Sequence, residues 1–110
     1  MLPIKIELPA STPSDLCDEF SDVLRRLGPV HEPGTQSYGI DTILLILAAI
    51  SATADLLAIG GLLIEWRDKA RRRGVPLDKV KIVAGDQTID LKNTDTQTLI
   101  RVLQGLRDET

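Results

Sequence analysis

The sequence TILLILAAISATADLLAIGGLLIEWRDKARRR, residues 42–73, decides the fold of this chain. Between Ile43 and Ile64 it holds twelve Leu or Ile residues, and at about 1.5 Å per residue a helix of this length can cross a bilayer. The run therefore predicts one long apolar helix over residues 42–66. Such a helix lies either in a membrane or in the core of a domain.

The position of Asp55 and the order of elements favour a buried helix. Leu and Ile each contribute roughly −0.3 to −0.6 kcal/mol to membrane insertion, whereas an Asp near the centre costs about 3 kcal/mol. Tyr38 and Trp66 flank the run as interfacial anchors do. A simple span, however, would place the strand predicted before it and the hairpin predicted after it in different compartments. We expect a helix in the core of the domain, with a membrane-inserted helix as the alternative.

One face of the predicted helix carries small and polar side chains, unlike a surface that faces lipid. Such a stripe permits close approach of a neighbouring helix or of a second copy of the chain. We expect it to be the interaction surface of an adaptor. Its predicted residues are Ala48, Ser51, Ala52, Asp55, Gly60, Gly61 and Trp66.

A basic run ends the apolar segment, and it allows three interpretations. Its residues are Arg67, Lys69, Arg71, Arg72 and Arg73. Cations at a helix C-terminus interact favourably with the helix dipole, which makes a simple cap the first interpretation. The second is contact with an anionic membrane surface. The third, a cleavage site for a trypsin-like peptidase at Arg71–Arg73, follows from the family resemblance described below.

The segment DKVKIVAGDQTIDLKN, residues 78–93, predicts a β-hairpin around a Gly85-Asp86 turn. This turn pairs Ile82 with Ile89 on an apolar face and Lys81 with Asp90 on the other face, where opposite charges stabilise the pair. A lone hairpin is marginally stable in water. We expect its third strand to be IKIEL, residues 4–8, because its apolar residues alternate with Lys5 and Glu7.

Two further segments predict amphipathic helices. Residues 13–27 carry an apolar stripe and are followed by Gly28-Pro29, which stops a helix. In TDTQTLIRVLQGL, residues 94–106, Thr94 and Gln97 have the spacing of a capping box. The predicted fold is a single α+β domain over residues 1–110, in the order strand, helix, long apolar helix, β-hairpin, helix. Its small sheet is mainly antiparallel or mixed and is covered by helices.

Composition argues against several classes of function. The net charge of −3 argues against nucleic acid as a partner. The chain has one His and one Cys, and no nucleophile and base stand at catalytic spacing, so we expect neither an enzyme nor a metal or other cofactor. The first ten residues do not have the pattern of a signal peptide, and we expect a cytoplasmic protein, with association with the inner membrane as the alternative.

The order of these parts resembles the effector-associated constant component family of small bacterial conflict-system proteins. The resemblance rests on IKIEL as the opening strand, the apolar helix ending in EWRDKARRR, the hairpin VKIVAGDQTIDLKN and the closing helix TDTQTLIRVLQGL. It covers nearly the whole chain, although each motif is of low specificity. The chain departs from the family in Asp41 and Asp55 and in its GPVHEPGTQS stretch.

The resemblance implies a non-enzymatic component that is encoded beside variable effectors, such as peptidases, and their regulators. It implies a role in bacterial immunity, as in anti-phage defence or programmed cell death, and supplies no catalytic residues to carry over. Our leading expectation is therefore an adaptor that self-associates or docks protein partners through residues 42–66. The alternative is an effector whose apolar helix inserts, oligomerises and disrupts the bilayer, with release by proteolysis at Arg71–Arg73.

Overall fold

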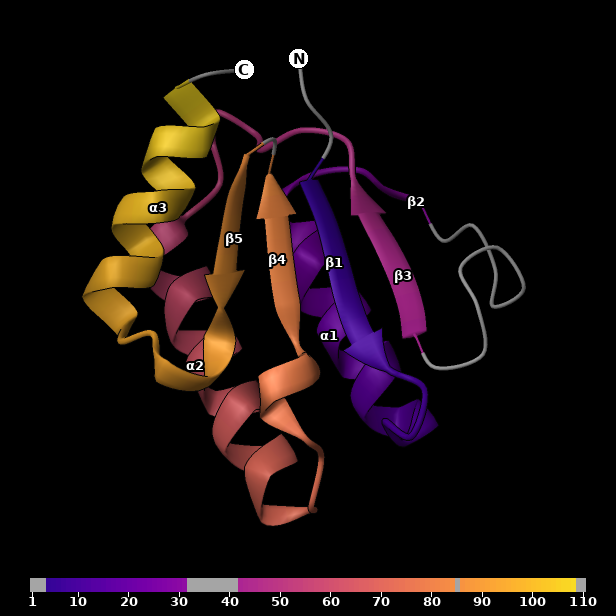
Figure 1. The fold of residues 1–110 in the computed structure, drawn as a ribbon. Helices are drawn as coiled ribbons and strands as arrows, with labels where there is room; N and C mark the ends of the chain where they lie inside the picture. The colour runs from indigo at the N-terminus through magenta and orange to yellow at the C-terminus, as the bar shows by residue number, and fades with distance from the viewer. Residues whose placement is uncertain (1–3, 32–41, 85, 109–110) are drawn as a thin grey trace.

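The computed structural model describes residues 4–31, 42–84 and 86–108, which form an α+β fold with a five-stranded antiparallel sheet. The strands are β1 (Ile4–Pro9), β2 (Val30–His31), β3 (Thr42–Leu47), β4 (Lys81–Ala84) and β5 (Gln87–Asp90). Their spatial order is β2-β3-β1-β4-β5, with β1 at the centre (Figure 1).

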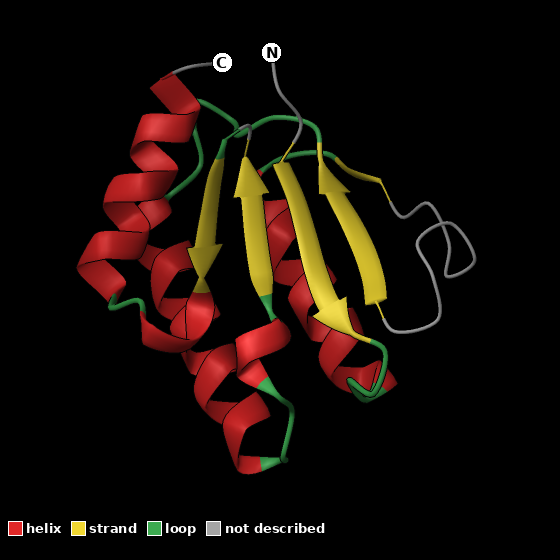
Figure 2. Cartoon of the chain, in the orientation of Figure 1, coloured by secondary structure: helices red, strands yellow, loops and turns green. Residues whose placement is uncertain are grey.

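Three α-helices accompany the sheet: α1 (Ser14–Leu27), α2 (Leu56–Arg72) and α3 (Thr96–Asp108). Two short 3-10 helices, η2 (Leu77–Lys79) and η3 (Leu91–Asn93), precede β4 and follow β5. Helices α1 and α2 lie behind the same face of the sheet, and α3 lies beside β5 and packs against α2 (Figure 2). The hydrophobic core fills the space between this face and the helices.

The predicted hairpin and its third strand are confirmed. Lys81 lies opposite Asp90 and Ile82 opposite Ile89, in the predicted register. Strand β1 pairs with β4, which places Ile6 opposite Ile82. The turn residue Gly85 lies outside the described residues.

The single long helix over residues 42–66 is wrong. Thr42–Leu47 is strand β3, which pairs with β1 along its whole length, and helix α2 begins only at Leu56. β3 is apolar on both faces, so its sequence lacks the alternation of apolar and polar residues that marks a half-buried strand. Such a sequence resembles that of a buried helix. The residue that marks the start of α2 is Asp55, whose carboxylate accepts a hydrogen bond from the Ala58 amide at 3.2 Å and caps the helix.

The start of the last helix also differs from the prediction by one residue. The capping side chain is Asp95, which accepts a hydrogen bond from the Thr98 amide at 2.7 Å. Thr94 instead donates its hydroxyl to the Asp90 carbonyl at 2.7 Å. Both residue types are good N-caps, so the sequence alone did not separate them.

The Asp95 cap gives the stability of this protein a predicted pH dependence. Hydrogen bonds from the Thr98 side chain and backbone hold the pKa of Asp95 below its ordinary value. A carboxyl group whose pKa is lowered in the folded state stabilises the fold at pH values above the ordinary Asp pKa. This stabilisation is lost as the pH falls through the lowered pKa. We expect Asp95→Ala to lower the urea midpoint at neutral pH and the difference from wild type to shrink in acid. A difference that stays constant down to the acid limit would contradict this account.

Candidate functional site

The face of the sheet turned away from α1 and α2 is not covered by any helix of the described chain (Figure 1). Side chains alternate between the two faces of a strand, and Ile4, Ile6 and Leu8 of β1 belong to the core. Lys5 and Glu7 therefore point to the uncovered side, together with their register partners. We call this surface the open face.

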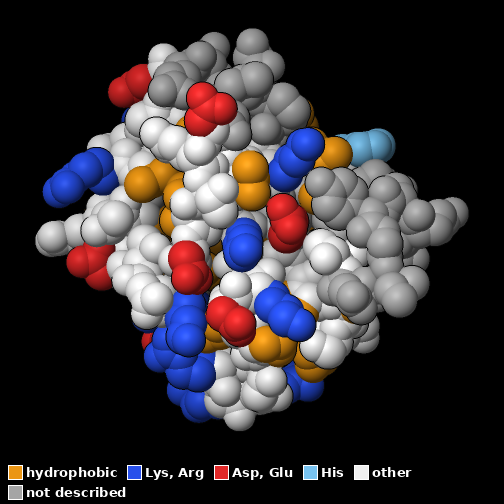
Figure 3. Space-filling view, viewed as in Figure 1, with side chains coloured by type: hydrophobic (Ala, Val, Ile, Leu, Met, Phe, Trp, Pro, Cys, Tyr) orange, Lys and Arg blue, Asp and Glu red, His pale blue; other side chains and the backbone are white. Residues whose placement is uncertain are grey.

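Two rows of side chains make up the centre of the open face. The first row runs across β3, β1, β4 and β5 and consists of Leu44, Glu7, Lys81 and Asp90. The second row consists of Ile46, Lys5, Val83 and Thr88. Figure 3 looks onto this side and shows charges of both signs between small apolar areas.

The apolar side chains of the open face are less exposed than the lysines beside them. Leu44 is 7% exposed, although it is not part of the core cluster under the helices. Ile46 and Val83 are half-buried, whereas Lys5 and Lys81 are exposed. The open face therefore offers apolar contact area between longer charged side chains.

The lysines of the open face have no acidic partner within the described part of the chain. Lys5, Lys81 and the neighbouring Lys79 make no ion pair with a described carboxylate, even though Glu7 and Asp90 flank Lys81 in the register. The Asp90 carboxylate instead accepts a hydrogen bond from the Lys92 amide at 3.0 Å. Three ammonium groups thus remain available on this side of the molecule.

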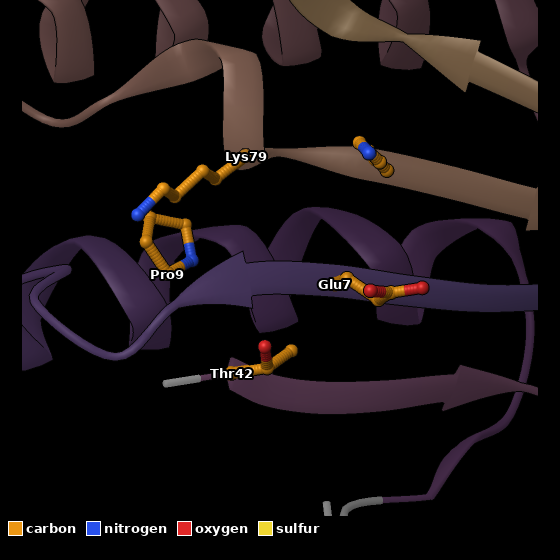
Figure 4. Close-up of a pocket in the computed structure, with 5 residues that line it drawn as sticks. Glu7, Pro9, Thr42 and Lys79 are labelled. Atoms are coloured by element: carbon orange, nitrogen blue, oxygen red, sulfur yellow. The ribbon is translucent and has the colours of Figure 1, made fainter. Parts of the chain in front are cut away.

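A hollow of about 250 Å³ lies at the end of the open face nearest η2. Its lining consists of Glu7, Pro9, Thr42, Lys79 and Lys81. In Figure 4, Lys79 reaches across above the ring of Pro9, and the hydroxyl of Thr42 points toward β1. Two ammonium groups, a hydroxyl and one carboxylate can form hydrogen bonds and ion pairs here. The set contains no His or Cys, and no described residues cluster as metal ligands.

The predicted interaction stripe does not exist as one surface, because its residues do not share one helix. Ala48, Ser51 and Ala52 lie exposed in the connection between β3 and α2, and Asp55 caps the helix. Trp66 is buried at 1% exposure and donates its indole N–H to the Leu16 carbonyl at 2.9 Å.

The two glycines of the predicted stripe have opposite surroundings. A Cβ on Gly60 would lie 2.8 Å from Cγ1 of Ile100 in α3, whereas a Cβ on Gly61 would meet nothing within 4 Å. Gly60 therefore allows close packing of α2 and α3, and Gly61 does not contribute to it.

This difference predicts opposite effects of the same substitution. Gly61→Ala should stabilise the protein by about 0.5–1 kcal/mol, because alanine has the higher helix propensity. Gly60→Ala should destabilise it by about 1 kcal/mol, since overpacking against Ile100 outweighs that gain. Thermal unfolding of the two variants measures this, and shifts of equal sign would contradict it.

The basic run mainly fastens α2 to its neighbours. Arg67 donates to the Thr94 carbonyl at 2.5 Å and to Asp68 at 3.2 Å, and Arg71 donates to the Lys92 carbonyl at 3.2 Å.

Two further cations of the run tie α2 to α1. Lys69 binds Glu19 at 2.7 Å. Arg73 donates to Asp15 at 2.5 Å and thereby holds the pKa of Asp15 below its ordinary value. Arg72 is exposed at the last position of α2. These contacts tie α2 to α1 and to the segment around Lys92 and Thr94, and the three interpretations of the run stay predictions.

Gly74, with a φ of 81°, ends α2 through a Schellman motif in which the Val75 amide bonds the Ala70 carbonyl at 3.0 Å. Cleavage at Arg71–Arg73 stays a prediction. A brief digestion of the folded chain with trypsin, followed by intact mass, should give a cut at these exposed arginines. A chain that survives uncut there would remove the proteolytic-release hypothesis.

Strand β3, the connection at residues 48–55 and helix α2 divide the apolar run, and none of the described helices combines the length and the hydropathy that a bilayer span requires.

Comparisons with known proteins give no relative for this chain. No protein-family model, curated protein or solved structure matches it.

The sequence pointed to only part of the open face. Strand alternation identified Lys5 and Glu7 as outward residues, and the hairpin register brought Lys81 beside Asp90. Leu44, Ile46 and Thr42 were missed, because they were assigned to a helix.

Proposed function

We propose that this protein is a non-catalytic adaptor of a bacterial conflict system, which docks a partner protein through the open face of its sheet. The observation that carries the proposal is the composition of that face, where apolar side chains lie between lysines without an acidic partner in the described chain. A second copy of the chain or a peptidase-type effector would be such a partner. The bacterial setting rests on the resemblance to the effector-associated constant component family.

The docking surface differs from the one that the sequence suggested. The apolar run over residues 42–66 takes part through Thr42, Leu44 and Ile46 of β3, while the buried side chains of α2 are used by the core. Antiparallel sheets are often solvated on one face, so an uncovered face alone is no evidence of a partner. The unpaired lysines and the adjoining hollow add the chemical features that a partner would recognise.

The substitution Val83→Glu tests this function. Val83 lies between Lys5 and Thr88, so the new carboxylate forms an opposite-charge cross-strand pair with Lys5 and leaves the fold intact. The matched control is Leu57→Glu, which adds the same charge at a leucine that is 72% exposed on α2, in the layer of helices.

The tagged full chain is co-expressed with the products of the genes that adjoin its own, and retained proteins are identified by mass. We expect wild type and Leu57→Glu to retain the same partner and Val83→Glu to lose it. Circular dichroism checks that both variants are folded. A folded Val83→Glu variant that retains the partner as wild type does would refute docking through the open face.

A further inference from the structure

We infer that the partner presents an acidic side chain flanked by apolar ones, and that its carboxylate binds in the hollow between Lys79 and Lys81. This inference rests on the proposed docking function and names the chemistry of the partner. It starts from a contrast between two groups of cations on the surface of the protein.

The first group consists of cations that the fold neutralises itself. Arg25 binds Asp22, Arg67 binds Asp68, and Lys69 binds Glu19, in each case with a nitrogen-to-oxygen distance of 3.2 Å or less. Helices α1 and α2 thus combine bases with acids at contact distance. Several cations of α1 and α2 are therefore already neutralised within the fold.

The second group consists of the lysines of the open face. Lys5, Lys79 and Lys81 approach no described carboxylate closely enough for an ion pair. Among the described residues, Glu7 is the one acid that lines the hollow, against two lysines. This part of the surface is therefore locally positive on a chain whose net charge is −3. Complementary charge across an interface favours an acidic partner.

The donors that line the hollow can bind a carboxylate-bearing side chain. Lys79 and Lys81 line it together with Thr42, and the ring of Pro9 lies beneath Lys79 (Figure 4). The two ammonium groups and the hydroxyl donate hydrogen bonds, and bonds to an ionised acceptor are the stronger kind. Glu7 of β1 also lines the hollow, and its negative charge disfavours a large anion of several charges, such as a polyphosphate.

The apolar residues of the open face determine what flanks the acid. Leu44 is next to Glu7 in the first row, and Ile46 and Val83 lie on either side of Lys5 in the second. A partner segment that places its carboxylate in the hollow and continues along the open face would pass over these three side chains. Apolar side chains at its neighbouring positions would bury them.

Two other classes of partner fit less well. Insertion into an anionic membrane requires apolar side chains that project beyond the charged ones, and here Leu44 is 7% exposed. Single-stranded nucleic acid is bound by aromatic stacking, and the rows of the open face carry no Phe, Tyr or Trp in the described strands. A protein segment with an acid among aliphatic residues satisfies all the observed features.

Selection from a displayed library of random peptides, with the folded full chain as the target, tests the inference. We expect enriched peptides to contain Asp or Glu next to Leu, Ile or Val. The affinity of an enriched peptide is then measured by fluorescence anisotropy for wild type, for the double variant Lys79→Glu/Lys81→Glu and for Arg26→Glu. Arg26 is an exposed residue of α1 in the layer of helices, so it controls for a charge reversal outside the open face, of half the size that the double variant makes.

The double charge reversal should weaken peptide binding about tenfold or more, whereas Arg26→Glu should change it less than about twofold. Lys79→Gln/Lys81→Gln, which adds no repulsion, should give an intermediate loss. Both lysines are exposed, and circular dichroism confirms that each variant is folded.

The outcomes separate this inference from the proposed function. Peptides without acidic residues, or equal binding by wild type and the double charge reversal, overturn the acidic partner. If Val83→Glu still abolishes binding of the selected peptide, docking through the open face survives. A library that yields no binder to the face also overturns the inference. If wild type floats with anionic vesicles and Lys79→Glu/Lys81→Glu does not, the partner is a membrane surface and not a protein.

Discussion

Trp66→Ala is expected to lower the free energy of unfolding by about 3–5 kcal/mol, the usual cost of truncating a buried tryptophan. Trp66 is 1% exposed and packs edge-on against Phe20, with 4.5 Å between the ring centroids and 72° between the planes. Its indole N–H also bonds the Leu16 carbonyl, which joins α2 to α1. Since small domains are stable by about 5–15 kcal/mol, the variant should be close to unfolded.

Urea unfolding followed by far-ultraviolet circular dichroism measures this loss, because the variant has no tryptophan left for fluorescence. Leu57→Ala is the control, and it should change stability by less than about 0.5 kcal/mol since Leu57 is exposed. Trp66→Phe should fall between the two, because it retains an aromatic ring and removes the hydrogen bond. If Trp66→Ala unfolded at the same urea concentration as wild type, α1 and α2 would not be joined through this residue.

Gly28→Ala is expected to destabilise the protein by about 3 kcal/mol, at the upper end for overpacking. Gly28 caps the C-terminus of α1 with a φ of 167°, an extended conformation that any residue can adopt. The cost is therefore steric, since an added Cβ would lie 2.0 Å from the Ala49 carbonyl oxygen. That carbonyl cannot move away easily, because hydrogen bonds from Ala48 to Pro29 and from Ser51 to Leu27 hold the connection.

The control for this steric argument is Gly105→Ala in α3, where an added Cβ meets nothing within 4 Å. Gly105→Ala should be neutral or stabilising, as expected for an exposed helical glycine. The pair is compared by thermal unfolding at one protein concentration. Equal midpoints for the two variants would show that the backbone around Ala49 relaxes without cost.

Local patterns in the sequence were sufficient for the elements whose two faces differ. The hairpin was predicted in its correct register because Ile82 with Ile89 and Lys81 with Asp90 require the same alignment. Helix α1 was predicted from its apolar stripe and its Gly28 stop. In each case one face is exposed to water and the other packs on the core. Apolar residues therefore recur in the sequence with the period of the helix or strand.

Strand β3 and the open face could not be predicted in the same way. β3 lies inside the sheet with apolar residues on both sides, so Ile43–Leu47 shows no alternation to distinguish it from a buried helix. Without β3, nothing in the sequence placed Leu44 beside Glu7 or Thr42 beside Pro9. The hollow depends on these long-range pairs, and they become visible only in the assembled sheet.

The central position of β1 has a consequence for how the chain folds. β1 is formed by Ile4–Pro9, but its two neighbours are Thr42–Leu47 and Lys81–Ala84, so the middle of the sheet is built from contacts that are distant in sequence. Contacts of high sequence separation slow folding. During synthesis, β1 cannot acquire its second neighbour until β4 has left the ribosome. Between the emergence of β3 and that of β4 the nascent chain therefore carries an unpaired edge of β1, and exposed strand edges favour aggregation during folding.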